Sequence, residues 1–262
     1  MEPLFLPGGR DRLFALYYAP RRADNRGTVL FVQPFAEELN KARAMVAGQA
    51  RLLAEQGYGV LVPDLYGCGD SPGQFHQARW EIWREDLLAC LDWLKSRAPG
   101  PPILWGLRLG ALLALEVARL RPAARLLLWQ PVSDGRSLLN QFLRLRTATA
   151  ALAGRRERVE QLRHCLLQGQ SLEVAGYRLH PELALALDRL QLPKPPAVPV
   201  DWLELAPSGE IPPARRSLIE GWPTAQGPVT VHSLPGVPFW STQEITRAPA
   251  WLEATGAILA AP

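Results

Sequence analysis

Short apolar runs alternate with longer segments of helical periodicity along most of this 262-residue chain. Uninterrupted apolar runs are typical of strands covered on both faces, and strands that alternate with helices form a parallel sheet with helices on each side. After an N-terminal hairpin at residues 4–6 and 13–18, the expected strands are residues 28–32, 60–63, 103–105, 126–129, 201–205 and 229–234. The expected helices between them are residues 42–56, 79–97, 111–120, 215–220 and 248–260. The pattern predicts an α/β fold on a mostly parallel sheet.

The alternation stops after residue 132. From residue 133 to about residue 192 no segment has the pattern of a strand, and residues 138–145, 159–167 and 183–190 have that of a helix. The proline-rich stretch LPKPPAVPV then closes the interruption, and the strand–helix pattern resumes. We therefore expect a core of residues 1–132 and 195–262, with a helical cap of residues 133–194 over the carboxyl edge of the sheet.

Composition excludes several classes of protein. A hydrophobic share of 48%, with 21 Gly and 25 Pro, belongs to a globular chain, not to a disordered or collagen-like one. The longest apolar runs, such as residues 111–115 and 257–261, fall far short of the about 20 residues of a membrane helix. The N-terminal MEPLFLPGGRDR has no basic segment followed by an apolar one, as a secretory signal would, so we expect a cytoplasmic protein.

Cysteine spacing and charge point to no metal, cofactor or nucleic acid. Cys68, Cys90 and Cys165 show no C-x-x-C spacing, so free thiols are predicted. The net charge of +4 comes from 26 arginines and 3 lysines against 25 acids, but the arginines are scattered singly or in pairs, without a basic stripe interleaved with aromatic residues. We predict no nucleic-acid partner, and the oligomeric state is left open.

The segment ILWGLRLGALLALEVA, residues 103–118, runs from a buried strand through Gly-x-x-x-Gly directly into a helix. This is the context of a nucleophile elbow, in which two glycines permit a tight turn around the attacking residue. An active enzyme carries Ser, Cys or Asp between the glycines, whereas this chain carries Arg108. A guanidinium stays protonated and has no lone pair with which to attack.

A second segment, residues 69–73, satisfies G-x-S-x-G formally, with Ser71 at its centre. A nucleophile needs a backbone N–H on the following residue to stabilise the oxyanion, and Pro72 has none. The segment also does not lead into a helix. We interpret it as a turn.

These motifs and their order resemble the α/β-hydrolase superfamily: GYGVLVPDLYGCGDS resembles its strand-and-loop signature, and WGLRLGALLA its elbow. More narrowly, VQPFAEELNKAR, LLLWQPV, EVAGYRLHPEL and GVPFWSTQEI are similar to the second of the two exosortase A-associated hydrolases. That family is associated with bacterial gene neighbourhoods for exopolysaccharide and PEP-CTERM protein sorting. The resemblance covers essentially the whole chain and implies an α/β-hydrolase fold in that biological setting, without establishing a reaction.

The resemblance also assigns roles to positions. It places the nucleophile at Arg108, the oxyanion donors at the N–H groups of Leu109 and of the Phe35 region, and the acid near Glu210, in SGEIPP. The base belongs in a G-x-x-H pattern after the last strand, where this chain reads GVPFW and has no histidine. His232, within the last strand, is a candidate for a displaced base; the alternative is an ordinary strand side chain that faces a helix or solvent. The triad is therefore expected to be degenerate.

Arg108 would lie at a helix N-terminus, where backbone N–H groups already favour a negative charge. Its guanidinium is therefore expected either to bind an anionic ligand or to pair internally with Glu37, Glu38 or Glu210, since a buried cation without a partner is costly. The two interpretations can coexist if the pair opens for a ligand.

Further polar residues crowd the loop QPFAEELNK, among them Gln33, Glu37 and Glu38. With Trp240 they are expected to contact a small anionic or saccharide-like ligand. The alternatives are helix capping by Asn40, surface solvation, and packing of Trp240 against the last helix.

Two functions stay open: a non-catalytic binding protein, and an active hydrolase or esterase with a non-standard catalytic set, in which Glu210 or Glu38 acts with His232 on water. Whether the chain is an enzyme is not decided by its sequence.

Overall fold

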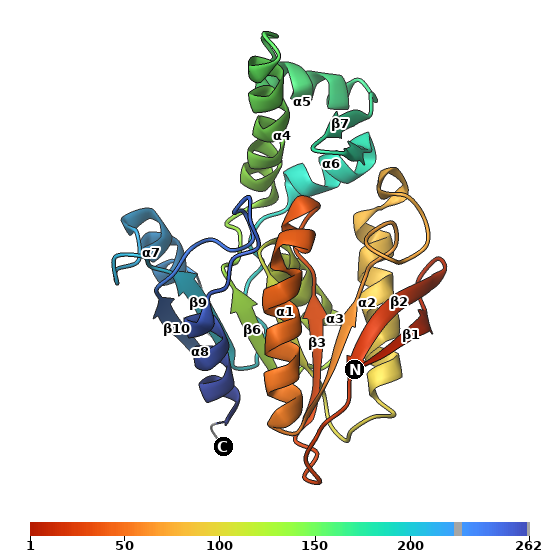
Figure 1. Ribbon diagram of the computed structural model, residues 1–262, viewed down its shortest axis with the longest axis vertical. Coiled ribbons are helices and arrows are strands. Elements are labelled where there is room, and N and C mark those ends of the chain that lie inside the picture. Colours follow the sequence, from red (N-terminus) through yellow and green to blue (C-terminus); the bar gives the residue numbers. More distant parts are fainter. Residues whose placement is uncertain (223–226, 261–262) are drawn as a thin grey trace.

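The computed structural model describes residues 1–222 and 227–260. Its centre is an eight-stranded sheet in the order β1-β2-β4-β3-β5-β6-β9-β10 (Figure 1). The strands are β1 (Glu2–Pro7), β2 (Arg12–Tyr18), β3 (Gly27–Val32), β4 (Tyr58–Pro63), β5 (Ile103–Leu107), β6 (Arg125–Trp129), β9 (Val200–Leu205) and β10 (Val229–Leu234). Within this sheet, only the pairings of β1 with β2 and of β2 with β4 are antiparallel. The predicted α/β architecture with a mostly parallel sheet is confirmed.

Helices cover both faces of the sheet, because the central strands are apolar on both sides. The core helices are α1 (Glu37–Glu55), α2 (Trp80–Leu94), α3 (Leu109–Leu120), α7 (Pro213–Glu220) and α8 (Pro249–Ala260). Helices α1 and α8 pack on one face, around Trp105, Trp129 and Trp251. Helices α2 and α3 pack on the other, around Leu30 and Leu104. The successive residues Leu104 and Trp105 thus serve opposite cores, as the two-residue period of a strand requires.

Helix α1 begins five residues earlier than the sequence suggested. The chain reverses at Ala36, whose φ is 48°, and enters the helix at Glu37 rather than at residue 42. Two acids in the first turn complement the positive end of the helix dipole, which favours this early start. Asn40 therefore lies inside the helix instead of capping it, and its Nδ2 donates to the hydroxyl of Tyr177 (3.3 Å).

Residues 133–194, which we call the cap, lie beyond the carboxyl ends of the strands (Figure 1). They form α4 (Gly135–Leu152), α5 (Val159–Leu167), β7 (Leu172–Val174), β8 (Tyr177–Leu179) and α6 (Pro181–Arg189). The expectation that this stretch contains no strand is wrong. Each strand has only three residues, too few for a sequence pattern, and the hairpin turns at Ala175 and Gly176, whose φ angles of 50° and 83° suit a two-residue turn.

Two contacts within the cap stabilise the start of α4. The Asp134 carboxylate accepts from the N–H of Ser137 (2.6 Å), as an N-cap does. At Gly135 a Cβ would collide with the carbonyl oxygen of Leu187, so only glycine allows α4 and α6 to pack this closely.

Candidate functional site

The turn between β5 and α3 has the elbow geometry that the sequence predicts. Arg108 is the N-cap of α3, with φ 55° and ψ −114°, a strained conformation for a residue other than glycine. A Cβ at Gly106 would press on the backbone of Ala111, and one at Gly110 would collide with the carbonyl of Val32. The protein therefore keeps the backbone of a nucleophile elbow, with an arginine at its tip.

The side chain of Arg108 is largely buried and has three neighbours. Its Nε donates to Glu38 Oε1 (3.0 Å), and its Nη2 donates to Gln141 Oε1 of the cap (3.2 Å). The guanidinium carbon lies 5.5 Å from the ring centre of Trp240, within the range of a cation–π contact. Since the Arg108 and Glu38 side chains are only 12% and 8% exposed, internal pairing takes up most of the charge at the elbow.

A cavity of about 170 Å³ lies beside this pair, between the core and the cap. At roughly 30 Å³ per water molecule, it has room for about five waters or one small ligand. Its polar lining comes from Glu37, Glu38, Arg108, Gln141 and Ser241, and its apolar lining from Phe35, Leu138, Phe142, Leu145 and Trp240. The site predictions Phe35, Glu37, Glu38, Arg108 and Trp240 thus lie around one cavity.

The two carboxyl groups of this cavity are unusual. Burial raises the pKa of Glu37, and the neighbouring charge of Glu38 raises that pKa further. Burial also raises the pKa of Glu38, although Arg108 opposes the shift. The Oε2 atom of each side chain is buried without a hydrogen-bond partner in the described part of the chain. This corner therefore offers acceptors in excess of donors.

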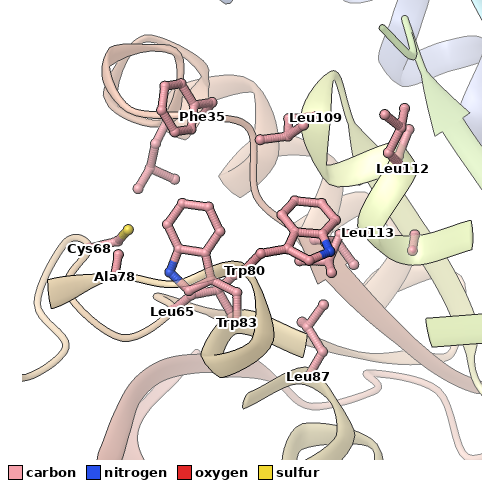
Figure 2. Close-up of a cluster of buried hydrophobic side chains, with 14 of the residues drawn as sticks. Phe35, Leu65, Cys68, Ala78, Trp80, Trp83, Leu87, Leu109, Leu112 and Leu113 are labelled. Atoms are coloured by element: carbon pink, nitrogen blue, oxygen red, sulfur yellow. The ribbon is translucent and has the colours of Figure 1, made fainter. Parts of the chain in front are cut away.

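Other predicted residues near the elbow have structural surroundings. The Oε1 of Gln33 accepts from the N–H of Leu65 (3.2 Å), so its amide braces the loop after β4 and does not line the cavity. Figure 2 shows Phe35 and Leu109 at the margin of a buried apolar cluster. Phe35 also borders the cavity, whereas Leu109, the first residue of α3, is buried and does not line the cavity. A role of Leu109 as an oxyanion donor stays a prediction.

The structure does not bring Glu210 or His232 to Arg108. The Glu210 side chain is 85% exposed in the loop after β9, and its ion pair within the described chain is with Arg216, at 4.0 Å. His232 Nε2 lies 3.0 Å from Asp201 Oδ1, and Asp201 also accepts from Arg125, the first residue of β6 (3.2 Å). His232 and Asp201 are therefore linked to the amino end of β6, where Arg125 lies, whereas Arg108 follows the carboxyl end of β5.

A buried acid at the end of β9 was not identified in the sequence analysis. Glu204, the penultimate residue of β9, is fully buried and accepts from both Nε and Nη2 of Arg215 (each 2.7 Å). The side chains of Trp202 and Gln130 each add a hydrogen bond of 2.8 Å. The signal available in the sequence for this pair was an acid inside an apolar strand, followed eleven residues later by an arginine on a helix. All acceptor capacity is used internally, which makes this group structural.

Within residues 1–222 and 227–260 no group of three or more His, Cys, Asp and Glu side chains could hold a metal ion. All three cysteines are free. Over the same residues, no helix combines the length and apolar character needed to cross a membrane.

Comparison with known proteins identifies the family. The family model described as serine aminopeptidase S33 (Hydrolase_4) matches residues 23–183, more than half of the chain. The mitochondrial palmitoyl-protein thioesterase ABHD10 of Rattus norvegicus is 29% identical over 133 residues, 51% of this chain and 43% of that protein. An uncharacterised protein of Rickettsia prowazekii, RP471, is 28% identical over 47% of this chain and 51% of its own. The chain thus spans about half the length of the curated relatives it matches.

Solved structures agree on the fold. Est1E from Butyrivibrio proteoclasticus, solved with ferulic acid, superposes with a TM-score of 0.70 at 15% identity, covering 98% of this chain and 96% of that one. Mouse ABHD10 gives a TM-score of 0.62 at 17% identity, covering 99% and 97%. These likenesses confirm the predicted α/β-hydrolase fold, and with the family model they show that the chain belongs to the serine aminopeptidase S33 family of α/β hydrolases.

Proposed function

We propose that this chain binds a small saccharide-like ligand in the cavity beside Arg108 and does not hydrolyse it. The observation that carries the proposal is the contact of Arg108, at the position of the nucleophile, with the segment in which the base would stand. The guanidinium lies 5.5 Å from the ring of Trp240, the residue that ends the GVPFW segment, and this segment contains no histidine. Neither side chain can attack an acyl carbon or act as a general base for a nucleophile.

Charge selects between the two ligand classes that the sequence left open. An anion would need a guanidinium free of other charges, but Glu38 already holds Arg108, and Glu37 lies in the same cavity. The carboxyl groups of Glu37 and Glu38 in the lining favour a ligand that brings hydroxyl groups, and the aromatic lining favours one with an apolar face. A neutral sugar has both. The resemblance to the exosortase A-associated hydrolases suggests that such a ligand belongs to exopolysaccharide or protein-sorting biology.

The alternative is an active hydrolase or esterase with a non-standard catalytic set. Membership of a hydrolase family supports this alternative, as does the thioesterase name of one relative. Against it stand the exposure of Glu210 and the pairing of His232 with Asp201, which leave neither residue at the elbow.

Calorimetric titration of the purified chain with glucose and with glucuronate at pH 7 tests the proposal. We expect heat of binding with glucose, loss of that heat in Arg108→Ala and Trp240→Ala, and its retention in Arg216→Ala, an exposed control. A fluorophosphonate probe and p-nitrophenyl esters test the alternative in parallel. Covalent labelling or ester turnover above background would overturn the proposal, as would titrations without heat for either sugar.

A further inference from the structure

The positive charge of this protein is concentrated in the cap. Residues 133–194 carry ten Lys and Arg against six Asp and Glu, a net charge of +4 that equals the net charge of the whole chain. The core is therefore neutral overall. Several cap acids are already engaged: Asp188 pairs with Arg136 and Arg163, and Glu157 pairs with Arg146.

The far end of the cap combines unpaired arginines with an exposed leucine. We call residues 151–158 the cap tip; they comprise the end of α4 and the segment that joins it to α5. Figure 1 shows the cap tip as the end of the cap most distant from the sheet. The three guanidinium groups of Arg155, Arg156 and Arg158 are exposed and form no ion pair among the residues that the structure describes. Leu152, the last residue of α4, is 92% exposed.

Folding does not account for this combination. Cations near the C-terminus of α4 complement the helix dipole, but a dipole gains nothing from a leucine in solvent. Leu152 buries almost none of its surface, and the residues on either side of it, Ala151 and Ala153, are exposed as well. An exposed apolar side chain within a few residues of exposed basic ones is compatible with a surface that lies on an anionic lipid membrane, where the leucine enters the interface and the arginines meet the headgroups.

We propose that the cap tip is a membrane-contact surface for anionic lipids, with Leu152 inserted and Arg155, Arg156 and Arg158 on the headgroup phosphates. Nucleic acid would use the arginines but would leave Leu152 without a function, and the tip has no aromatic side chain on which a base could stack. The proposal is independent of what the cavity binds.

The geometry also sets where the ligand cavity would lie. Gln141 lines the cavity, and Leu152 lies eleven residues further along the same helix. At 1.5 Å per residue, this length of α4 places the cavity at most about 16 Å from the membrane surface. A protein bound in this way would keep the cavity close to the lipid surface without entering the bilayer.

Sedimentation with lipid vesicles tests the proposal. The full chain is mixed with vesicles of phosphatidylcholine alone or with 30% phosphatidylglycerol, at low and high NaCl. We expect binding to the anionic vesicles only, weakened by salt. Each arginine replaced by glutamine is expected to weaken binding about fivefold, so Arg155→Gln/Arg156→Gln/Arg158→Gln weakens it about a hundredfold. Leu152→Ser is expected to weaken it while leaving the salt dependence intact.

The end of α3 offers a matched control. Leu120, 48% exposed, is flanked by Arg119 and Arg121 at the opposite edge of the sheet. The variant Arg119→Gln/Leu120→Ser/Arg121→Gln is expected to bind anionic vesicles like the unmodified chain. Equal losses in the control and tip variants would assign binding to net charge alone and overturn the proposal. So would an absence of binding to anionic vesicles, equal binding to neutral ones, or an unchanged affinity of Leu152→Ser.

Discussion

At the scale of single residues, the turn between β5 and α3 holds a buried ion pair. The backbone at Arg108 is strained, and its side chain contacts Glu38, Gln141 and Trp240. Because burial raises the pKa of Glu38, protonation of this carboxyl lies closer to neutral pH than for an exposed glutamate. The charge state of Glu38 therefore controls whether Arg108 is available to an anion.

Replacing Glu38 by Gln is expected to change ligand selectivity. A neutral amide no longer competes for the guanidinium, so the affinity for glucuronate should rise about tenfold at pH 7, the scale of one charge-assisted hydrogen bond. In the unmodified chain the same affinity should rise as the pH is lowered and Glu38 takes up a proton. Calorimetric titration at several pH values checks both. A pH dependence equally steep in Glu38→Gln would contradict the assignment to Glu38, and Glu210→Gln, at an exposed acid, serves as the control.

Asp86 of α2 makes stability itself depend on pH. Its carboxylate accepts from the N–H groups of Gly9 and Tyr66, at 2.9 Å each, but burial outweighs these bonds and raises its pKa from 3.8 to about 6. A carboxyl whose pKa is raised by folding stabilises the protein below its unfolded pKa, and that contribution is lost as the pH rises to the folded value. We expect the free energy of unfolding to fall by about 2 kcal/mol between pH 4 and pH 6.

Urea denaturation across this pH range measures the effect. Asp86→Asn should be less stable overall, because the amide oxygen cannot serve both N–H groups as two carboxylate oxygens do, but its stability should vary less with pH. Glu81→Gln, at an exposed acid of the same helix, should keep the pH dependence of the unmodified chain. A full pH dependence in Asp86→Asn would assign it to other groups.

At the scale of elements, the parts that follow from periodicity were predictable from the sequence, and those that depend on contacts between distant segments were not. The buried runs and the elbow emerged from residues 28–32 and 103–118, since apolar continuity and glycine spacing are local signals. The early start of α1 at Glu37 and the β7–β8 hairpin depend on a tight reversal and on three-residue strands, which leave no periodic trace.

The same division holds for the site. The sequence identified Arg108, Glu37, Glu38, Phe35 and Trp240 from their places in loops at one edge of the sheet, and the structure places them around one cavity. It missed Gln141, because nothing in an amphipathic cap helix marks which residue meets the elbow. Glu204 was missed because an acid in a buried strand is predictable only once its partner is known.

The pairing of Glu204 with Arg215 joins α7 to β9. Removing one partner of a buried ion pair leaves the other charge without compensation, so Arg215→Met is expected to lower the free energy of unfolding by about 3 to 5 kcal/mol. Its neighbour Arg216 is exposed and pairs with Glu210 only at 4.0 Å, so Arg216→Met should cost about 0 to 1 kcal/mol. Urea denaturation of the two variants checks the difference. Similar costs for both would mean that Glu204 does not depend on Arg215.

At the scale of the whole molecule, the cap and the core share one apolar interior. A single buried cluster runs from the strands and α2 into α4, α5 and α6. The ring of Phe142 on α4 lies 5.0 Å from that of Phe35 in the core, and Tyr177 of the hairpin lies 5.0 Å from Phe75. A cap attached in this way is a structural layer of the domain, and the cavity beside Arg108 is a gap between that layer and the core.

We therefore expect the cap and the core to unfold in one transition. Phe142→Ala removes the ring that packs on Phe35, and deleting a buried aromatic side chain costs about 3 to 5 kcal/mol, so the melting temperature of the entire chain should fall. Phe5→Ala, at an exposed phenylalanine of β1, should leave it nearly unchanged. Differential scanning calorimetry distinguishes a shared transition from separate ones. Two resolved transitions, of which Phe142→Ala shifts only one, would contradict a common core, because a cluster shared by both parts cannot lose stability in the cap alone.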